Sequence, residues 1–381
     1  MGRAIFKEEH DIFRASFKKY LAKEVTPNLE HWEKDGIVPR EVWRKMGQNG
    51  FLCPWLEEQY GGTGAGYEYS VIITEELAYV GASGLLAGLH SDIIVPYIHS
   101  FGTEEQKQKW LPGCASGDIL VAIAMTEPNT GSDLSAIRTT AVRDGDHYVI
   151  NGQKTFISLG LLSDLVIVVA KTNPKADPPF KGISLICVEA GTPGFSRGRK
   201  LEKMGLHSQD TAEMSFEDCR VPLSNLLGKE GQGFYCLMQK LQGERLVCSV
   251  MAQAMAEAML DMTVKYCKER TAFGQPIGSF QHNTFKIVEM ATEIELGRTF
   301  VDTLVADFIA GKDIVKKVSM AKAWVCEMAN RVAYHCVQLH GGYGYMEEYP
   351  ICRFARDIRV YPIFAGTTEI MKLIVGRMMG F

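Results

Sequence analysis

The spacing of apolar side chains divides the chain into three parts. Over residues 1–118, apolar residues recur every three or four positions, as at Phe13, Phe17 and Leu21, and this period predicts amphipathic helices. Residues 119–228 contain short β-branched runs separated by turn residues, which predicts strands. Helical spacing returns in longer segments over residues 229–381. This order predicts an α+β protein with a β-domain between two helical domains, and it argues against a Rossmann fold.

One predicted helix carries an acid on its apolar face. Glu244 falls in the same three- and four-residue series as the apolar residues around it, so its carboxyl is expected to face a core. Burial would raise the pKa of this carboxyl towards neutrality and would let it accept a proton from carbon. A salt bridge to Lys240 or Arg245 at a helix interface is the alternative. The apolar members of the series are Leu237, Leu241, Cys248, Met251 and Met255.

Composition narrows the class of protein. The chain has 381 residues, 46% hydrophobic and 23% charged, which is typical of a globular protein. A net charge of −4 without a basic run argues against binding to nucleic acid or to an anionic membrane. Short apolar runs and an N-terminus without a signal-peptide core predict a cytoplasmic protein, or one of the mitochondrial matrix if the chain is a processed form. Ten cysteines without a Cys-x-x-Cys pair predict reduced core residues, and no metal site is expected.

Two segments of the predicted β-domain could bind a cofactor. Residues 126–133 read Thr-Glu-Pro-Asn-Thr-Gly-Ser-Asp and follow the apolar run at 120–125, so their hydroxyls and backbone N–H groups could hold a phosphate or the polar edge of a ring. A plain turn is the alternative. In residues 154–158, strand alternation would place Phe156 and Ser158 on one face, where they could flank a flat cofactor. An ordinary half-buried strand explains this pattern equally well.

Several segments of the last part contain or adjoin breaks between helices: residues 270–274, Gln281, residues 338–342 and residues 365–369. Glycine permits close approach of a ligand to the backbone, and Arg270 could neutralise a pyrophosphate. Each segment alone is also explained by a helix-ending loop. Motifs of P-loop proteins, zinc proteases, α/β-hydrolases and dinucleotide-binding folds are absent from the sequence.

Together, these segments resemble the acyl-CoA dehydrogenase family along essentially the whole chain. The resemblance implies an N-terminal helical domain, a middle β-barrel or β-sandwich, a C-terminal four-helix bundle, bound FAD and a homotetramer. The sequence around Glu244 and after residue 338 looks most similar to the long-chain type. The matching motifs are Ala-Met-Thr-Glu-Pro-Asn-Thr-Gly-Ser-Asp (124–133), Phe-Ile-Ser (156–158), Lys-Met-Gly-Leu (203–206), Arg-Thr-Ala-Phe-Gly (270–274), Gln-Leu-His-Gly-Gly (338–342) and Gly-Thr-Thr-Glu (366–369).

The resemblance also implies which residues hold FAD. One set would bind the flavin, a second would contact the FAD of a neighbouring subunit, and a third would contact the FAD of its own subunit. Phe156 replaces a tryptophan common in the family and should still cover the flavin face. The first set is Met125, Thr126, Gly131, Ser132, Phe156, Ile157 and Ser158; the second is Arg270, Phe273, Gln281, Gln338, Leu339, His340, Gly341 and Gly342; the third is Thr367, Thr368 and Glu369.

The position of the catalytic base departs from the pattern of many family members. They carry the base just before the Gly-Thr of the last motif, where this chain has Ala365. In the long-chain and isovaleryl types the base lies in a segment similar to residues 242–245, and Glu244 matches it. The implied substrate contacts are Ser132, Tyr235, Gln242, Arg245, Ala365 and Gly366.

By this resemblance, Glu244 would remove the α-proton of an acyl-CoA while a hydride leaves the β-carbon for flavin N5. The product would be a trans-2-enoyl-CoA, and electron-transfer flavoprotein would take the electrons, as in fatty acid β-oxidation. The Ala365 N–H and a flavin ribityl hydroxyl would bind the thioester carbonyl. Small residues at Gly84, Ala87 and Gly88 predict a channel for medium or long straight chains. An isovaleryl-type dehydrogenase, an acyl-CoA oxidase and a non-catalytic flavin-binding protein are the alternatives.

Overall fold

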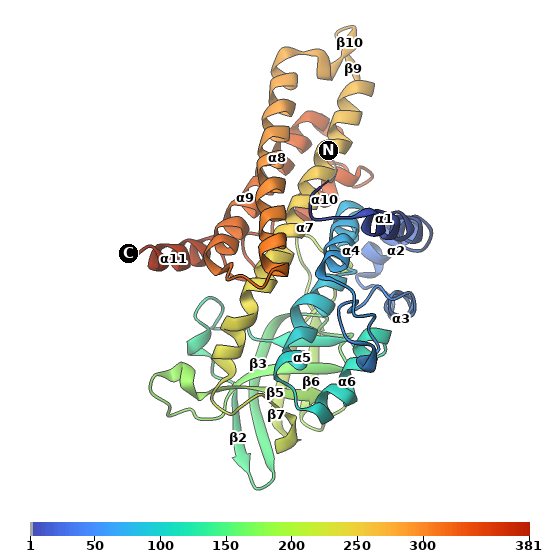
Figure 1. Cartoon of the computed structure of the whole chain (residues 1–381). Helices are drawn as coiled ribbons and strands as arrows, with labels where there is room; N and C mark the ends of the chain where they lie inside the picture. Colours follow the sequence, from blue (N-terminus) through green and yellow to red (C-terminus); the bar gives the residue numbers. More distant parts are fainter. Residues whose placement is uncertain (1–2) are drawn as a thin grey trace.

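The N-terminal part consists of helices in the computed structural model, which describes residues 3–381 (Figure 1). Two π-helical turns interrupt this part, η1 (Leu21–Val25) after α1 and η4 (Leu89–Ile94) before α5. The helices are α1 (Glu8–Tyr20), α2 (Leu29–Asp35), α3 (Arg40–Gln48), α4 (Tyr67–Tyr79), α5 (Val95–Phe101) and α6 (Glu104–Ser116).

The middle part is one twisted sheet in the order β6-β7-β3-β2-β4-β5-β8, and β1 pairs in parallel with β4. The central strands β4 and β5 are apolar along nearly their whole length because both of their faces are buried. The strands are β1 (Val121–Ala124), β2 (Thr140–Asp144), β3 (His147–Ser158), β4 (Leu165–Lys171), β5 (Ile183–Glu189), β6 (Phe195–Lys200), β7 (Thr211–Pro222) and β8 (Leu226–Leu227).

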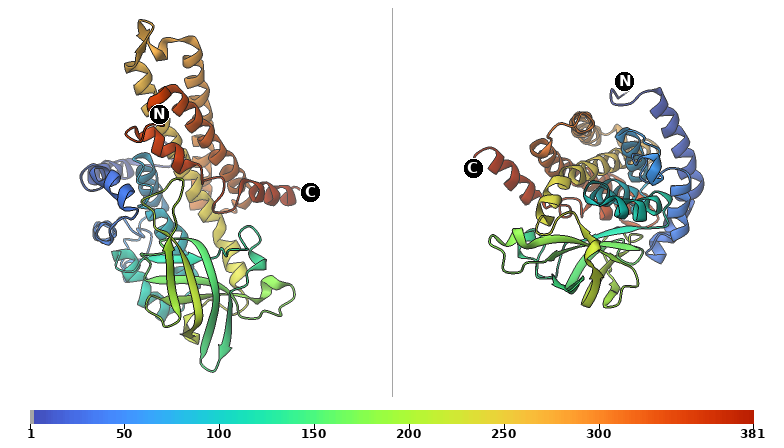
Figure 2. Two further views of the ribbon diagram at one scale, coloured as in Figure 1. Left: turned by 180° about the vertical axis from the view of Figure 1, so that it is seen from behind. Right: turned by 60° about the horizontal axis from the view of Figure 1, so that its bottom comes forward.

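The C-terminal part is built around the long helix α7, which packs against α4, α8 and α9. Figure 2 shows α7 running from the sheet to the opposite end of the molecule, where a small hairpin leads into α8. The helices are α7 (Gly233–Glu269), α8 (Gln281–Ile309), α9 (Val315–His340), α10 (Pro350–Ile358) and α11 (Thr368–Met378), and the hairpin strands are β9 (Thr271–Ala272) and β10 (Gln275–Pro276).

α7 is more apolar as a whole than its short uninterrupted apolar runs indicate. By length and composition alone α7 could cross a membrane, but 67% of its most apolar window is buried inside the molecule. A core helix that packs on three neighbours passes the same test. Nine of the ten cysteines are also buried and all ten are free, as expected for core residues.

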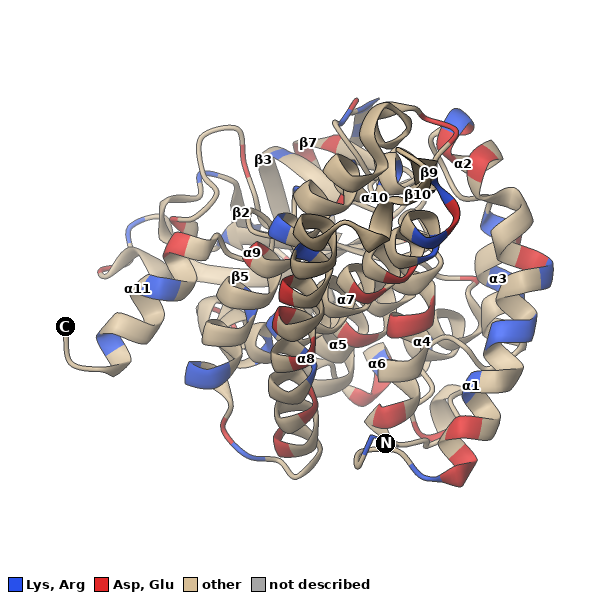
Figure 3. Cartoon of the chain, turned by 90° about the horizontal axis from the view of Figure 1, so that it is seen from above, with Lys and Arg blue, Asp and Glu red and all other residues tan. Residues whose placement is uncertain are grey.

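One hydrophobic cluster joins the N-terminal helices to the sheet and to α7. Tyr97 and Ile98 of α5 pack in this cluster with Ile167 of β4, Leu185 of β5 and Val247 of α7. This packing fixes α5 between the sheet and α7, which places a turn of α5 beside Glu244. Charged residues lie along α1 on the outside of the molecule, with acids in its first turn and lysines in its last (Figure 3).

Candidate active site

Glu244 lies on the buried face of α7, as its spacing predicts. Its side chain is 5% exposed, and its Oε1 accepts a hydrogen bond of 2.6 Å from the Tyr97 hydroxyl. Burial raises the pKa of the Glu244 carboxyl to about 7, although the Tyr97 hydrogen bond and the charge of Arg245 each lower it. This pKa suits a group that must be ionised to accept a proton and that works near neutral pH.

The salt-bridge alternative for Glu244 does not agree with the contacts of its neighbours. Lys240 Nζ donates to Ser100 Oγ at 2.5 Å, and Arg245 Nη1 donates to Ser319 Oγ at 3.3 Å. Within residues 3–381, neither cation forms an ion pair with Glu244. Glu244 is therefore a buried carboxyl whose only hydrogen-bond partner in the described chain is a neutral hydroxyl.

Tyr97 contacts the predicted base but is not among the site residues predicted from the sequence. It lies at the third position of α5, directly after Pro96 and the π-helical turn η4. π-Helical turns are frequent at functional sites. The signal available in the sequence was a phenol hydroxyl within the apolar stretch 93–98, because a buried hydroxyl needs a hydrogen-bond partner.

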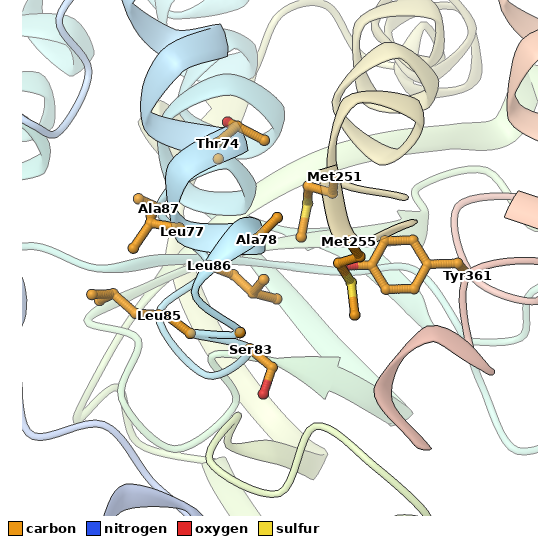
Figure 4. A pocket seen from close by; sticks show the side chains of 13 residues that line it. Thr74, Leu77, Ala78, Ser83, Leu85, Leu86, Ala87, Met251, Met255 and Tyr361 are labelled. Atoms are coloured by element: carbon orange, nitrogen blue, oxygen red, sulfur yellow. The ribbon is translucent and has the colours of Figure 1, made fainter. Parts of the chain in front are cut away.

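An apolar pocket lies along the face of α7 beyond Glu244 (Figure 4). Met251 and Met255 of α7 line it, seven and eleven residues after Glu244, which is about 10 and 16 Å along a helix axis. Tyr361 closes it on one side. The remaining lining residues come from α4 and the following loop: Thr74, Leu77, Ala78, Gly81, Ala82, Ser83, Leu85, Leu86, Ala87 and Gly88.

The small residues predicted to line an acyl channel have two different roles. Ala87 and Gly88 line the pocket, as expected. Gly84 does not, because a Cβ on this residue would lie 2.5 Å from the backbone oxygen of Ser208. Gly84 therefore permits close packing of this loop against the middle part of the chain. The prediction for Gly84 was wrong, since the sequence pattern cannot show which neighbour a glycine faces.

A second carboxyl with a raised pKa, Asp92, lies near this pocket on η4 and is partly buried. Its Oδ2 would lie 3.8 Å from a Cβ on Gly88, and its Oδ1 is enclosed without a hydrogen-bond partner in the described chain. Burial raises the pKa of Asp92 to about 7, although the nearby polar groups of Ser70 and Trp55 lower it. A raised pKa thus does not by itself distinguish a base from another buried acid. Asp92 serves below as a comparison for Glu244.

The loop that includes Met125 and Thr126 is anchored by a buried ion pair. Lys154 Nζ donates to Glu127 Oε1 at 2.9 Å and to the Met125 carbonyl at 3.0 Å. Glu127 also accepts the N–H groups of residues 138 and 139, and it pairs with Thr130 across the turn. Burial lowers the pKa of Lys154 to about 8, although Glu127 raises it. This anchorage holds the loop against β3.

The expectation of a regular strand around Phe156 was wrong. A register shift between Lys154 and Ile157 forms a bulge, and Phe156 adopts φ 59°. Its side chain is 69% exposed, whereas Ile157 is buried and Ser158 is half-buried. The bulge lies beside the anchored loop, because Thr155 N–H donates to the Thr126 carbonyl at 3.0 Å. A Cβ on Gly131 of the same loop would meet nothing within 4 Å, and Ser132 is exposed. An exposed aromatic ring next to an open loop fits a flat polar cofactor.

A second group of predicted cofactor residues gathers at the opposite end of the molecule. Arg270, Phe273 and Gln281 surround the β9–β10 hairpin, far from the sheet (Figure 1). Phe273 is 95% exposed at φ 50°. His340 stacks on Tyr266 with ring centroids 4.3 Å apart, which brings the end of α9 to the same place. This second group therefore cannot meet a ligand bound at the 125–133 loop of its own chain. It comprises Arg270, Phe273, Gln281, Gln338, Leu339, His340, Gly341 and Gly342.

The turn before α11 presents an unused backbone donor. Ala365 has φ 50° and Gly366 has φ 90°. Within residues 3–381, the Ala365 N–H donates to no acceptor. Thr367 caps α11 by accepting the Ile370 N–H at 3.2 Å, and the acid in the first turn of this helix is Glu369. The free N–H of Ala365 is therefore available to a ligand.

The other predicted substrate residues lie on the first turns of α7. Tyr235 is exposed and its ring centroid lies 6.0 Å from that of Phe180. Gln242 Oε1 and Arg245 Nε are enclosed atoms without hydrogen-bond partners in the described chain. Unpaired buried polar atoms are costly, and a bound ligand would satisfy them.

Comparison with known proteins decides the family. Models of the acyl-CoA dehydrogenase N-terminal, middle and C-terminal domains match residues 7–118, 122–219 and 231–380. The chain belongs to the acyl-CoA dehydrogenase family. It is therefore an oxidoreductase of the acyl-CoA dehydrogenase type, and the family predicted from the motifs is confirmed. Family members are FAD-dependent flavoproteins of fatty acid and amino acid catabolism, and tetramers are typical.

Individual relatives cover nearly the whole acyl-CoA dehydrogenase chain. The long-chain specific acyl-CoA dehydrogenase of Sus scrofa mitochondria is 48% identical over 98% of this chain and 87% of the relative. Mitochondrial isovaleryl-CoA dehydrogenase of Pongo abelii is 38% identical over 97% of this chain and 88% of the relative. A crystal structure of an acyl-CoA dehydrogenase from Geobacillus kaustophilus is 59% identical, covers 100% of both chains and has a TM-score of 0.99. The predicted α+β fold is confirmed.

Proposed function

We propose that this acyl-CoA dehydrogenase catalyses FAD-dependent α,β-dehydrogenation of a medium- or long-chain acyl-CoA to a trans-2-enoyl-CoA. The observation that carries the proposal is Glu244, a buried carboxyl with a pKa near 7, on the helix face that continues into an apolar pocket. A base and a pocket for an acyl chain on one helix face suit removal of a proton from the α-carbon.

Glu244 would accept the α-proton at Oε2. The Tyr97 hydroxyl occupies Oε1, whereas Oε2 has no hydrogen-bond partner among residues 3–381 and is not fully enclosed. The hydrogen bond from Tyr97 fixes the rotamer of the carboxylate and favours its ionised form. The apolar surroundings exclude water, so the carboxylate is a stronger base than it would be in solution.

The thioester carbonyl needs donors because negative charge develops on its oxygen when the α-proton leaves. The Ala365 N–H, which has no acceptor in the described chain, is the donor that this chain supplies. Gln242 and Arg245 carry unpaired polar atoms near the base and would bind the polar part of the acyl-CoA. Bound FAD would supply the hydride acceptor and a ribityl hydroxyl as second donor.

The two groups of cofactor residues suggest how FAD is held. The 125–133 loop and the Phe156 bulge would hold the flavin, with Thr367, Thr368 and Glu369 as further contacts in the same chain. The group around the β9–β10 hairpin lies too far away for this FAD, so we infer that it contacts the FAD of a neighbouring subunit in a homotetramer. FAD binding should therefore depend on assembly.

We expect a medium or long straight acyl chain, because the small residues Ala87 and Gly88 line the pocket along α7. An isovaleryl-type activity is the alternative, since the isovaleryl-CoA dehydrogenase relative covers nearly the whole chain. We expect electrons to pass to electron-transfer flavoprotein in fatty acid β-oxidation, in the bacterial cytoplasm or the mitochondrial matrix. An acyl-CoA oxidase would instead deliver electrons to oxygen, and a non-catalytic flavin protein would have no need for Glu244.

Anaerobic titration of the FAD-loaded protein tests the proposal. Straight-chain acyl-CoA esters of increasing length and isovaleryl-CoA are added under nitrogen, and the flavin absorbance is followed. We expect bleaching with medium and long chains, slow return of colour in air and rapid return with electron-transfer flavoprotein. Bleaching by none of the esters would contradict the proposed activity. A highest kcat/KM on isovaleryl-CoA would favour the alternative substrate, and fast reoxidation by air would favour an oxidase.

A further inference from the structure

Lys322 is a fully buried lysine of α9 that the proposed mechanism does not use. Its side chain has no exposed surface, and it forms no ion pair within residues 3–381. A buried ammonium group without a carboxylate partner is costly, so such a residue calls for an explanation. The Nζ of Lys322 makes one hydrogen bond in the described chain, donating to the carbonyl oxygen of Gly366 at 2.5 Å.

The same helix also binds the turn before α11 at a second point. Glu327, five residues after Lys322, accepts a hydrogen bond of 2.9 Å at Oε1 from the Thr368 hydroxyl. Ala365, at φ 50°, directly precedes the first attachment point, and Gly366, at φ 90°, is that attachment point. An alanine with positive φ is strained and persists only where its surroundings hold it. The two side chains of α9 supply that constraint.

The constrained turn presents the backbone group that the reaction needs. The Ala365 N–H donates to no acceptor in the described chain, and the Gly366 carbonyl, one residue later, points to Lys322. Rotation of the Gly366 carbonyl away from Lys322 would change the backbone angles on both sides of it. The Ala365 N–H lies two peptide planes before the Gly366 carbonyl, so the contact with Lys322 restrains its direction through the intervening backbone of Ala365 and Gly366.

We propose that Lys322 is a positioning residue for α-proton removal: it holds the turn at residues 365 and 366 so that the Ala365 N–H donates to the thioester oxygen of the bound acyl-CoA. This inference rests on the proposed function. Lys322 touches neither substrate nor cofactor in this scheme.

The acidity of a bound ligand tests this role without hydride transfer. A 3-thiaacyl-CoA of medium chain length has an α C–H bond made acidic by the neighbouring sulfur and carbonyl. In the FAD-loaded enzyme its proton moves to the Glu244 carboxylate, the carbanion remains on the ligand, and no electron reaches the flavin. Stacking of the carbanion on oxidised flavin gives a long-wavelength absorption band, and the amplitude of this band measures the deprotonated fraction.

We expect Lys322→Met to lower the deprotonation equilibrium by about 10- to 100-fold, part of the ~10²- to 10³-fold effect of losing one such donor. Ligand binding, measured from quenching of flavin fluorescence, should change much less, and kcat should fall more than KM rises. Lys322→Arg retains a cationic donor and should recover part of the band. Lys317→Met on an exposed turn of α9 is the matched control and should leave the band unchanged.

Unchanged deprotonation in a folded Lys322→Met enzyme with parental FAD content would overturn the inference. If Lys322→Met does not fold, Thr368→Val decides the question: it removes the second attachment of the turn to α9 and should also weaken the band, and an unchanged band would contradict the role of the turn. Failure of the proposed function would give a different result. None of the acyl-CoA esters would then bleach the flavin of the parental enzyme, and the 3-thiaacyl-CoA would give no long-wavelength band.

Discussion

Glu75 and Glu244 are two buried carboxyls with opposite electrostatics. Glu75 of α4 is 3% exposed and pairs with Arg3, Arg14 and Arg298 at 2.7, 2.8 and 2.6 Å. Burial would raise the pKa of Glu75, but the three arginines outweigh it and lower the pKa to about 2. Glu244 is 5% exposed, has the Tyr97 hydroxyl as its only hydrogen-bond partner among residues 3–381, and has a pKa raised to about 7.

The different pKa values of these two carboxyls show that burial alone does not define a catalytic acid or base. Similar burial gives an ion-pair anchor at Glu75, where cations from α1, α8 and the N-terminal segment meet. At Glu244, the proposed proton acceptor, no cation forms an ion pair within residues 3–381. Glu75 stays ionised at neutral pH and ties three segments together. Glu244 changes its protonation near neutral pH, so it can exchange a proton with a substrate.

The largest expected effect comes from removing proton acceptance at Glu244. Glu244→Gln keeps the shape of the side chain, and flavin reduction by acyl-CoA should fall by at least ~10²- to 10⁴-fold with near-normal ligand binding. Rapid-scan absorbance under nitrogen measures the rate. Asp92→Asn is the matched control, since Asp92 has a similarly raised pKa, and it should reduce flavin within a few-fold of the parental rate. Loss of reduction in Asp92→Asn alone would assign the base to Asp92.

Removing the acid at Glu75 should affect folding rather than catalysis. Glu75→Gln leaves three arginines without their shared carboxylate, and the free energy of unfolding should fall by about 3 to 5 kcal/mol. Urea denaturation measures this loss, while the reduction rate per folded flavin site should stay parental. Glu289→Gln, which removes an exposed pair with Lys286, should cost less than about 0.5 kcal/mol. A Glu75→Gln protein as stable as the parent would show that the buried network contributes little.

Tyr97→Phe should shift the pH profile of Glu244 without removing the base. The hydroxyl donates to the carboxylate and lowers its pKa, so its loss raises the pKa above the parental value of about 7. The acid limb of the kcat/KM profile should move to higher pH, and activity below pH 7 should fall by up to about tenfold. The Tyr60 hydroxyl donates to Glu104, away from Glu244, so Tyr60→Phe should leave the acid limb of the kcat/KM profile unchanged. A limb that moves to lower pH would reverse the assigned role.

The pH dependence of stability should also reflect the raised pKa of Glu244. The pKa of Glu244 rises on folding, so protonation stabilises the folded state, and this contribution is lost as pH increases from about 4.5 to about 7. Compared with Glu244→Gln, the free energy of unfolding of the parent should therefore fall by on the order of 1 kcal/mol for each pH unit in this range. Glu75 behaves in the opposite way, because its contribution is lost only as pH falls through about 2. Denaturant unfolding at several pH values measures both, and a flat difference between parent and Glu244→Gln would contradict the raised pKa.

Local pattern was sufficient for much of the site. The spacing of Leu237, Glu244 and Met255 assigns one buried face to α7, since helical period depends only on neighbours along the chain. The change of period near residues 119 and 229 predicts the helix, strand, helix order, which the structural relatives confirm. The ordered motifs identified the family for the same reason, because each is a short continuous segment.

The features that could be predicted from the sequence are therefore local: which face of α7 is buried, where strands replace helices, and which short motifs occur in order. The partners of each buried group could be identified only from the three-dimensional structure. Tyr97 meets Glu244 across 147 positions, Glu75 meets Arg298 across 223, and Lys322 meets Gly366 across 44. Whether a buried carboxyl is neutralised by cations or left beside one hydroxyl depends on such long-range contacts, because charge acts through space while periodicity acts along the chain.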